Sequence, residues 1–181
     1  MEGMWRSLPV VLLFTAVALA GCAPNETSQE SSELIDVPST SPISLPPEEP
    51  LSTTPGPCPY LDVGFVEQAN GQRVTGTGTD DRFDPPACVF LTYGDEPQLE
   101  VTVHHTGSVA EARAVVDRAA PVDSTSLADS PAGWSGGRSG GEDGAIYAVS
   151  KETVAVVVRS NQAESVKAQA VAEEAITNLD L

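Results

Sequence analysis

The sequence predicts a single α+β domain over residues 58–181, in which a mostly antiparallel sheet carries helices packed on one face. Apolar and polar residues alternate along several short segments, as in strands, while two longer segments repeat apolar residues at the spacing of a helix. The strands follow one another through short returns instead of repeated helical crossovers, and this favours antiparallel pairing. The predicted order of elements is αβββαββα.

The first half of this domain is expected to hold one helix and three strands. Pro59–Ala69 is expected to form a short helix that Asn70 and Gly71 end, because this pair supplies a left-handed stop and Pro suits a first turn. The alternative is a strand that turns through the same pair as a type I′ hairpin. The three strands, chosen for β-branched content and two-residue alternation, are Arg73–Thr79, Ala87–Tyr93 and Leu99–His104.

A helix and a hairpin are expected to follow. Ser108 and Glu111 form a capping box in sequence, and the helix that they open ends before Pro121. The long stretch after this helix is expected to be a loop. Ala145–Val149 and Thr153–Arg159 are then expected to pair as a hairpin. Valines on both faces of its second strand indicate a strand in the interior of the sheet.

The chain is expected to end in a helix that lies on the sheet. Asn161 is expected to cap this helix, because Glu164 stands three residues later in a second capping box. Apolar residues then recur at intervals of three and four, the spacing that aligns side chains along one face of a helix. The stripe consists of Ala168, Val171, Ala172, Ala175, Ile176 and Leu179.

The segment before the domain is expected to consist of a signal peptide and a tether. Residues 8–20 are almost wholly apolar, but the run is shorter than the roughly 20 residues that a helix needs to cross a bilayer. It fits the central region of a signal peptide over residues 1–21. Residues 22–57 are rich in Pro, Ser, Thr and acidic residues and lack an apolar period, which predicts a disordered tether.

The end of the apolar run resembles a bacterial lipobox. In that motif small residues stand directly before a cysteine, as Leu19, Ala20 and Gly21 stand before Cys22. The resemblance implies that a signal peptidase cuts before Cys22 and that this residue carries a lipid anchor on the extracytoplasmic face of the cell membrane. The alternative is an ordinary secretory cut after Ala20. The number of cysteines favours the lipobox, because lipidation leaves an even number of thiols.

The remaining cysteines, Cys58 and Cys88, are expected to form a disulfide. Exported domains fold in an oxidising compartment, where pairs of cysteines form disulfides. A redox-active pair is more often a CxxC motif, and the sequence contains none. Chain entropy predicts that closing a loop of this length stabilises the fold by about 3.7 kcal/mol. The bond would pin the first helix to the strand that begins after Pro86.

The charge of the chain excludes some partners. Its 181 residues include 26 acidic and 9 basic side chains, and the formal net charge is −17. Binding of nucleic acid by counterion release and a polybasic hold on anionic lipid both need clustered Lys and Arg. We therefore expect no nucleic acid partner, and membrane contact only through the lipid anchor. Three Cys and two His are too few for a four-ligand zinc site without carboxylates, and we expect no cofactor.

An acidic loop and a histidine pair are weak candidates for a metal site. Asp80, Asp81 and Asp84 could supply oxygens to Ca²⁺, but the spacing of an EF-hand is absent. The simpler interpretation is a solvated strand end with Arg82 as the local counterion. The pair His104–His105 lies in a predicted strand, so the two rings point to opposite faces and do not converge on one ion.

The glycine-rich stretch 133–144 is the most unusual segment. It lacks the Lys of a phosphate-binding loop and contains two acidic residues, so nucleotide binding is not expected. The simpler interpretation is a flexible hairpin loop. The alternative is a mobile ligand-binding flap that presents Trp134 and Arg138, residue types that are enriched at binding hot spots.

Three segments around the cysteines resemble an actinobacterial lipoprotein family, the domain-of-unknown-function family numbered two thousand and twenty. These segments are Cys58–Asp62, Asn70–Thr75 and Phe83–Phe90. The resemblance covers most of residues 58–181. It implies a location in the cell envelope and brings no reaction, cofactor or partner.

The sequence shows no recognisable catalytic set, because GxSxG and SxxK motifs are absent and the histidines lack an evident nucleophile. We therefore expect a non-enzymatic module that binds a ligand or protein of the cell envelope. One alternative is a structural or accessory lipoprotein. The other is an envelope hydrolase that uses as acid and base carboxylates such as Asp80, Asp84, Glu142 or Asp143.

Different cysteines are expected to control stability and anchoring. Replacing Cys58 or Cys88 with Ser should lower the free energy of unfolding by about 3 to 4 kcal/mol, because the loop is no longer closed. Replacing Cys22 with Ala should release the protein from the membrane and leave its stability unchanged. Thermal melts and membrane fractionation measure the two effects, and exchanged phenotypes would contradict the assignment.

Overall fold

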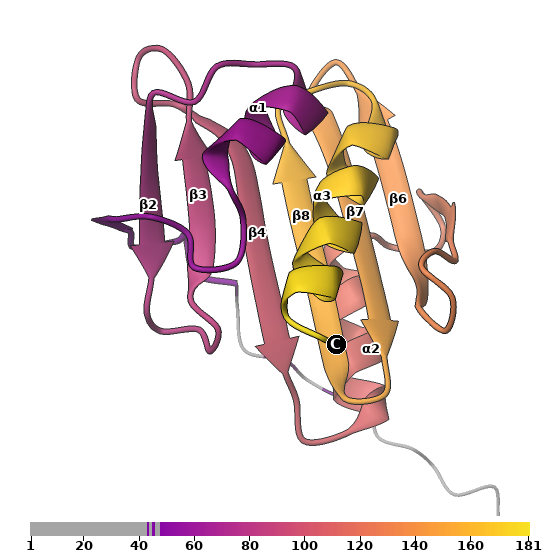
Figure 1. Ribbon diagram of the computed structural model, residues 1–181. Coiled ribbons are helices and arrows are strands. Elements are labelled where there is room, and N and C mark those ends of the chain that lie inside the picture. Colours follow the sequence, from indigo (N-terminus) through magenta and orange to yellow (C-terminus); the bar gives the residue numbers. More distant parts are fainter. Residues whose placement is uncertain (1–42, 44, 46–47) are drawn as a thin grey trace, which may run out of the picture. The chain divides into compact units, whose positions relative to one another are not determined.

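Among the residues that the structure describes (43, 45 and 48–181), eight antiparallel strands form one sheet in the computed structural model (Figure 1). The elements are β1 (Thr54–Pro55), α1 (Val63–Asn70), β2 (Gly76–Asp80), β3 (Ala87–Leu91), β4 (Pro97–His105), α2 (Val109–Ala119), β5 (Ser126–Ala128), β6 (Ser135–Gly141), β7 (Gly144–Lys151), β8 (Val154–Ser160) and α3 (Ser165–Asn178). Their order across the sheet is β1–β2–β3–β4–β8–β7–β6–β5. The single α+β domain and the order αβββαββα are confirmed, and the structure adds β1, β5 and β6.

The first helix begins later than predicted. The Oδ1 atom of Asp62 accepts the N–H of Phe65, so Asp62 caps α1 and Pro59 lies outside the helix. Gly71 ends the helix with a φ of 74°, which is the left-handed stop that the Asn-Gly pair predicts. The hairpin alternative for this segment is wrong.

The helices lie on both faces of the sheet instead of on one. α1 and α3 share a core with Val156 and Val158 of β8, whereas α2 packs against Ala155 and Val157 on the other face. Figure 1 shows α3 in front of β7 and β8, and α2 behind them. The prediction of a single covered face is therefore wrong for α2. Both faces of β8 are apolar, so each face needs its own cover.

The second half of the chain follows the predicted elements, with one correction. Ser108 caps α2 through a bond of 3.2 Å from the N–H of Glu111, and β8 is an interior strand between β4 and β7. The predicted cap of the last helix is wrong, because α3 begins after Glu164 and the side chain of Asn161 donates instead to Gln72. The predicted stripe of α3 is buried from Ala168 to Ile176, and Leu179 is partly buried against the same core.

The glycine-rich stretch is mostly a strand, not a loop. Ser135–Gly141 forms β6, which pairs with β7 along its whole length. Trp134 is only 3% exposed and belongs to the main core, while Nη1 of Arg138 donates to Gln169 of α3. The prediction of a flap that presents Trp134 and Arg138 is therefore wrong. The indole is buried as core and is not displayed to a ligand.

The N-terminal boundary of the domain lies before Cys58. Thr54 and Pro55, expected in the tether, pair with β2 as strand β1, and the N–H of Ser52 donates to Asp80 at 2.8 Å. Cys22, the expected signal peptide and most of the expected tether lie outside the described residues. Within the part of the chain that is described, no helix is both long enough and apolar enough to span a bilayer.

Glycine is required in β6 where other elements come close to its backbone. A Cβ atom at Gly136 would meet the carbonyl oxygen of Ala148, and it would lie 2.8 Å from Cγ1 of Val116 in α2. Real Cβ atoms do not approach other heavy atoms so closely. At Gly141, in contrast, a Cβ atom would have nothing within 4 Å. The close packing of α2 on the sheet therefore depends on a glycine at residue 136.

Replacing Gly136 with Ala should lower the free energy of unfolding by about 3 kcal/mol, because α2 and β7 must move away from the new methyl group. The matched control is Gly141→Ala in the same strand, which should change stability by less than about 0.5 kcal/mol. Urea unfolding curves compare the two variants. Equal stability of the two would contradict the close packing of α2 on β6.

Candidate functional site

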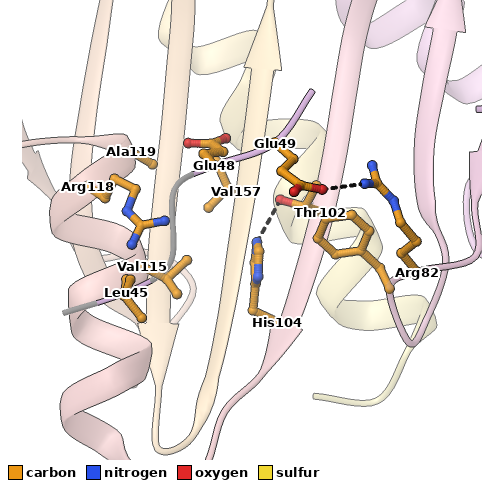
Figure 2. A pocket seen from close by; sticks show the side chains of 11 residues that line it. Leu45, Glu48, Glu49, Arg82, Thr102, His104, Val115, Arg118, Ala119 and Val157 are labelled. Carbon is orange, nitrogen blue, oxygen red and sulfur yellow. Dashed lines mark hydrogen bonds and ion pairs between the residues drawn. The ribbon is translucent and has the colours of Figure 1, made fainter. Parts of the chain in front are cut away.

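A groove of about 510 Å³ lies beside α2, on the sheet face that this helix covers only in part (Figure 2). Strands β4 and β8 form its floor, α2 forms one wall, and the loop between β2 and β3 forms the other. A segment that precedes β1 runs across it. The lining residues are Leu45, Glu48, Glu49, Arg82, Phe83, Thr102, His104, Val115, Arg118, Ala119 and Val157.

Strand β4 places Thr102 and His104 in the groove, because alternate side chains of a strand share a face. Nε2 of His104 lies 3.1 Å from Oγ1 of Thr102, and its ring stands edge-on to Phe83 with the centroids 5.4 Å apart. Burial lowers the pKa of His104 below its ordinary value, which keeps the ring neutral near pH 7. His105 is exposed, and the expectation that alternation separates the two histidines agrees with this arrangement.

The wall formed by the β2–β3 loop depends on a buried carboxylate. Asp80 is 1% exposed and accepts the N–H of Ser52 at 2.8 Å and Nη2 of Arg82 at 2.6 Å. The hydrogen bonds from Arg82 are the main reason why the pKa of Asp80 is held well below its usual range. The Arg82 guanidinium also donates to Glu49 at 2.9 Å and to the carbonyl oxygen of Pro50 at 2.9 Å.

These contacts decide between the two interpretations of the acidic loop. Arg82 is the counterion of Asp80, as the simpler interpretation predicts, although Asp80 is buried and not solvated. Its carboxylate accepts bonds from Ser52 and Arg82, whereas Asp81 and Asp84 are exposed. In residues 43, 45 and 48–181, no group of three or more His, Cys, Asp or Glu side chains is arranged to hold a metal ion. The weak calcium candidate of Asp80, Asp81 and Asp84 is therefore not formed.

Arginines and acidic side chains share this face of the sheet. Arg82 and Arg118 line the groove, and Arg159 of β8 lies next to it and pairs across the ladder with Glu100. Nη2 of Arg159 lies 2.8 Å from Oε1 of Glu48. Burial raises the pKa of Glu100, and the nearby Arg159 opposes that rise.

The remainder of the lining is apolar. Phe83, Val115, Ala119 and Val157 lie between the arginines on the floor and walls of the groove. A cleft with apolar surface and a few convergent charged groups is the usual form of a ligand site. The arrangement can therefore hold a molecule that carries carboxylates together with small apolar groups.

The carboxylates considered for hydrolysis lie in two separate groups. Asp80 is the last residue of β2 and Asp84 lies in the loop after it, whereas Glu142 and Asp143 form the turn after β6. The order of the antiparallel strands makes β2 and β6 run in opposite directions, so these two groups lie at opposite ends of the sheet (Figure 1). No acid and base pair can form between them across one groove.

The disulfide is the predicted site feature that the structure confirms directly. Sγ of Cys58 is bonded to Sγ of Cys88, with 5.5 Å between the Cα atoms. The bond ties the segment before α1 to β3, as expected. The sequence analysis did not predict the groove. It placed Arg118 in a helix and Val157 in a strand, and nothing in the sequence indicated that the two residues line a common site.

Comparison with known proteins adds a family. Residues 42–181 match the model of a family that is described as a domain of unknown function, DUF2020. A search of the curated proteins finds no match to this chain. The matched range begins before the disulfide and includes β1, in agreement with the domain boundary in the structure.

Replacing Asp80 with Asn should lower the free energy of unfolding at pH 7 by roughly 1 to 3 kcal/mol, because charge-assisted hydrogen bonds are lost. The pKa of Asp80 is depressed in the folded protein, so its contribution is present above the pKa of the unfolded chain, about 3.9, and is lost as the pH falls toward the folded value. The difference between variant and wild type should therefore shrink below about pH 4.

Urea unfolding at pH 7 and pH 3 measures this difference. The control is Asp81→Asn, at an exposed neighbour, which should have little effect at either pH. An equal loss of stability at both pH values in Asp80→Asn would show that packing, and not charge, explains the effect.

Proposed function

The chain belongs to the DUF2020 family, and we propose that it is a non-enzymatic module that binds a ligand or protein of the cell envelope. The groove beside α2 is the observation that carries this proposal. A purely structural or accessory lipoprotein needs no concave site, whereas this domain has one with both charged and apolar lining. The alternative is an envelope hydrolase, and the carboxylates considered for it lie in two groups at opposite ends of the sheet.

The proposed site accepts an anionic partner. Arg82, Arg118 and Arg159 lie on one face of a chain with a formal net charge of −17. The guanidinium groups of Arg82 and Arg159 can pair with carboxylates, as they do with Glu49 and Glu48. Phe83 and Val157 then supply apolar contact between the charged positions.

We also propose that the protein is a lipoprotein of actinobacterial type, anchored through Cys22 on the extracytoplasmic face of the cell membrane. The lipobox-like residues before Cys22 support this location. The disulfide between Cys58 and Cys88 supports it independently, because such bonds persist in oxidising compartments. The proposed partner is therefore a component of the envelope that the anchored domain can reach.

Photo-crosslinking from the groove in living cells tests the binding function. A photoreactive amino acid at Val115, in the wall of the groove, should form adducts with an envelope component. The same amino acid at Tyr93, which is 71% exposed in the turn between β3 and β4, should not. Equal adduct yields from the two positions would contradict the proposed site.

Matched arginine variants of α2 show whether charge contributes to this binding. Arg118 and Arg113 are both exposed on the same helix, but only Arg118 lines the groove. Arg118→Gln should lower the yield of adducts from Val115 at least fivefold, and Arg113→Gln should leave it unchanged. Equal losses from both variants would indicate a general effect of charge and not a site.

A further inference from the structure

The groove is crossed by a short acidic segment of the same chain. Residues 48–51, which we call the strap, precede the point where Ser52 binds Asp80. Glu48 is paired with Arg159 at 2.8 Å and Glu49 with Arg82 at 2.9 Å. Figure 2 shows both glutamates on this segment, with Glu49 directed toward Arg82. The strap therefore places its carboxylates on the arginines that the proposed ligand would use.

The strap is held by contacts that water can replace. The side chains of Glu48 and Glu49 are 57% and 77% exposed, and those of Arg159 and Arg82 are 32% and 45% exposed. Exposed ion pairs of this kind contribute little, because solvent screens them and two long side chains must be ordered. Firm attachment begins only at Ser52, whose N–H binds the buried carboxylate of Asp80. The strap can thus leave the groove while β1 stays in the sheet.

The strap also shows which chemistry the groove accepts. Adjacent carboxylates reach arginines of different elements, and the carbonyl oxygen of Pro50 accepts a bond of 2.9 Å from Arg82. Leu45 lines the same groove as Val115, so an apolar side chain ahead of the carboxylates has a place. Proline keeps such a segment extended, which lowers the entropy that is lost on binding.

We propose that the strap is a displaceable ligand in cis, and that the groove binds an extended acidic peptide segment of a partner protein with the same pattern: an apolar residue followed by adjacent acidic residues and proline. This inference rests on the proposed function, because it names the ligand of the same groove. The apparent affinity for the partner is then the intrinsic affinity multiplied by the fraction of molecules in which the strap has left Arg82 and Arg159.

Fluorescence anisotropy tests the competition with a defined probe, a labelled synthetic peptide that copies residues 45–53. The mature full-length chain should bind this peptide weakly, because its own strap occupies Arg82 and Arg159. The double variant Glu48→Gln, Glu49→Gln should bind it with a Kd at least tenfold lower. The matched control is Glu142→Gln with Asp143→Asn, which removes the same charge from exposed residues of the β6–β7 turn and should bind as the wild type does.

Further arms of the experiment locate the binding. In the strap variant, Arg159→Gln should raise the Kd at least fivefold, because it removes the partner of Glu48, and Arg113→Gln should not. A peptide with both glutamates replaced by glutamine should bind at least tenfold more weakly, and added salt should weaken the unmodified peptide. The single variants Glu48→Gln and Glu49→Gln should give intermediate affinities, and thermal melts verify that every variant is folded.

A strap variant that binds the peptide no more tightly than the wild type or the charge control would overturn the inference. Absence of peptide binding to every variant would also overturn it. Either result is separable from the proposed function, because crosslinking from Val115 that depends on Arg118 would still identify the groove as a binding site for another ligand.

Discussion

The carboxylate of Asp80 joins segments of the chain that are distant in sequence at one end of the sheet. It accepts hydrogen bonds from the backbone of Ser52, before β1, and from Arg82, in the loop after β2. Arg82 is fixed in this way and can reach Glu49 and the carbonyl oxygen of Pro50. One buried charge thus sets a wall of the groove and the path of the strap. The buried charge of Asp80 is tolerated because hydrogen bonds from Arg82 and from backbone N–H groups replace those that water would make.

Patterns that depend on neighbouring residues were sufficient to predict many elements. The cap at Ser108 and the left-handed stop at Gly71 involve atoms only a few residues apart, and both agree with the structure. Strand β6 has no apolar alternation, because glycines occupy it where Val116 and Ala148 come close. Such contacts between distant segments leave no periodic signal in the sequence. The valines on both faces of β8 did indicate an interior strand, but the helices were expected on one face, and α2 covers the other.

The groove is harder to predict than the fold, because its lining comes from separate parts of the chain. The sequence identifies Arg82 as the counterion of an acidic loop. Its hydrogen bonds to Glu49 and to the carbonyl oxygen of Pro50 depend on the path of the chain before β1, which the sequence does not indicate. Arg118 lies in the last turn of α2, where a basic residue also suits the helix dipole, so its position in the groove needs the packing of that helix. The disulfide was predictable because the expected export and the number of cysteines favour it, without knowledge of which segments are in contact.

The disulfide has a mechanical consequence for a chain that is held from its N-terminal side. Tension would load the strap first, then the pairs Thr54–Thr79 and Pro55–Gly78 of β1. At Cys58 the force would pass through the covalent bond into Cys88 of β3 and would bypass the intervening segment, which contains α1 and β2. A modest pull would therefore displace the strap and uncover the groove before the force reaches β3 through the disulfide.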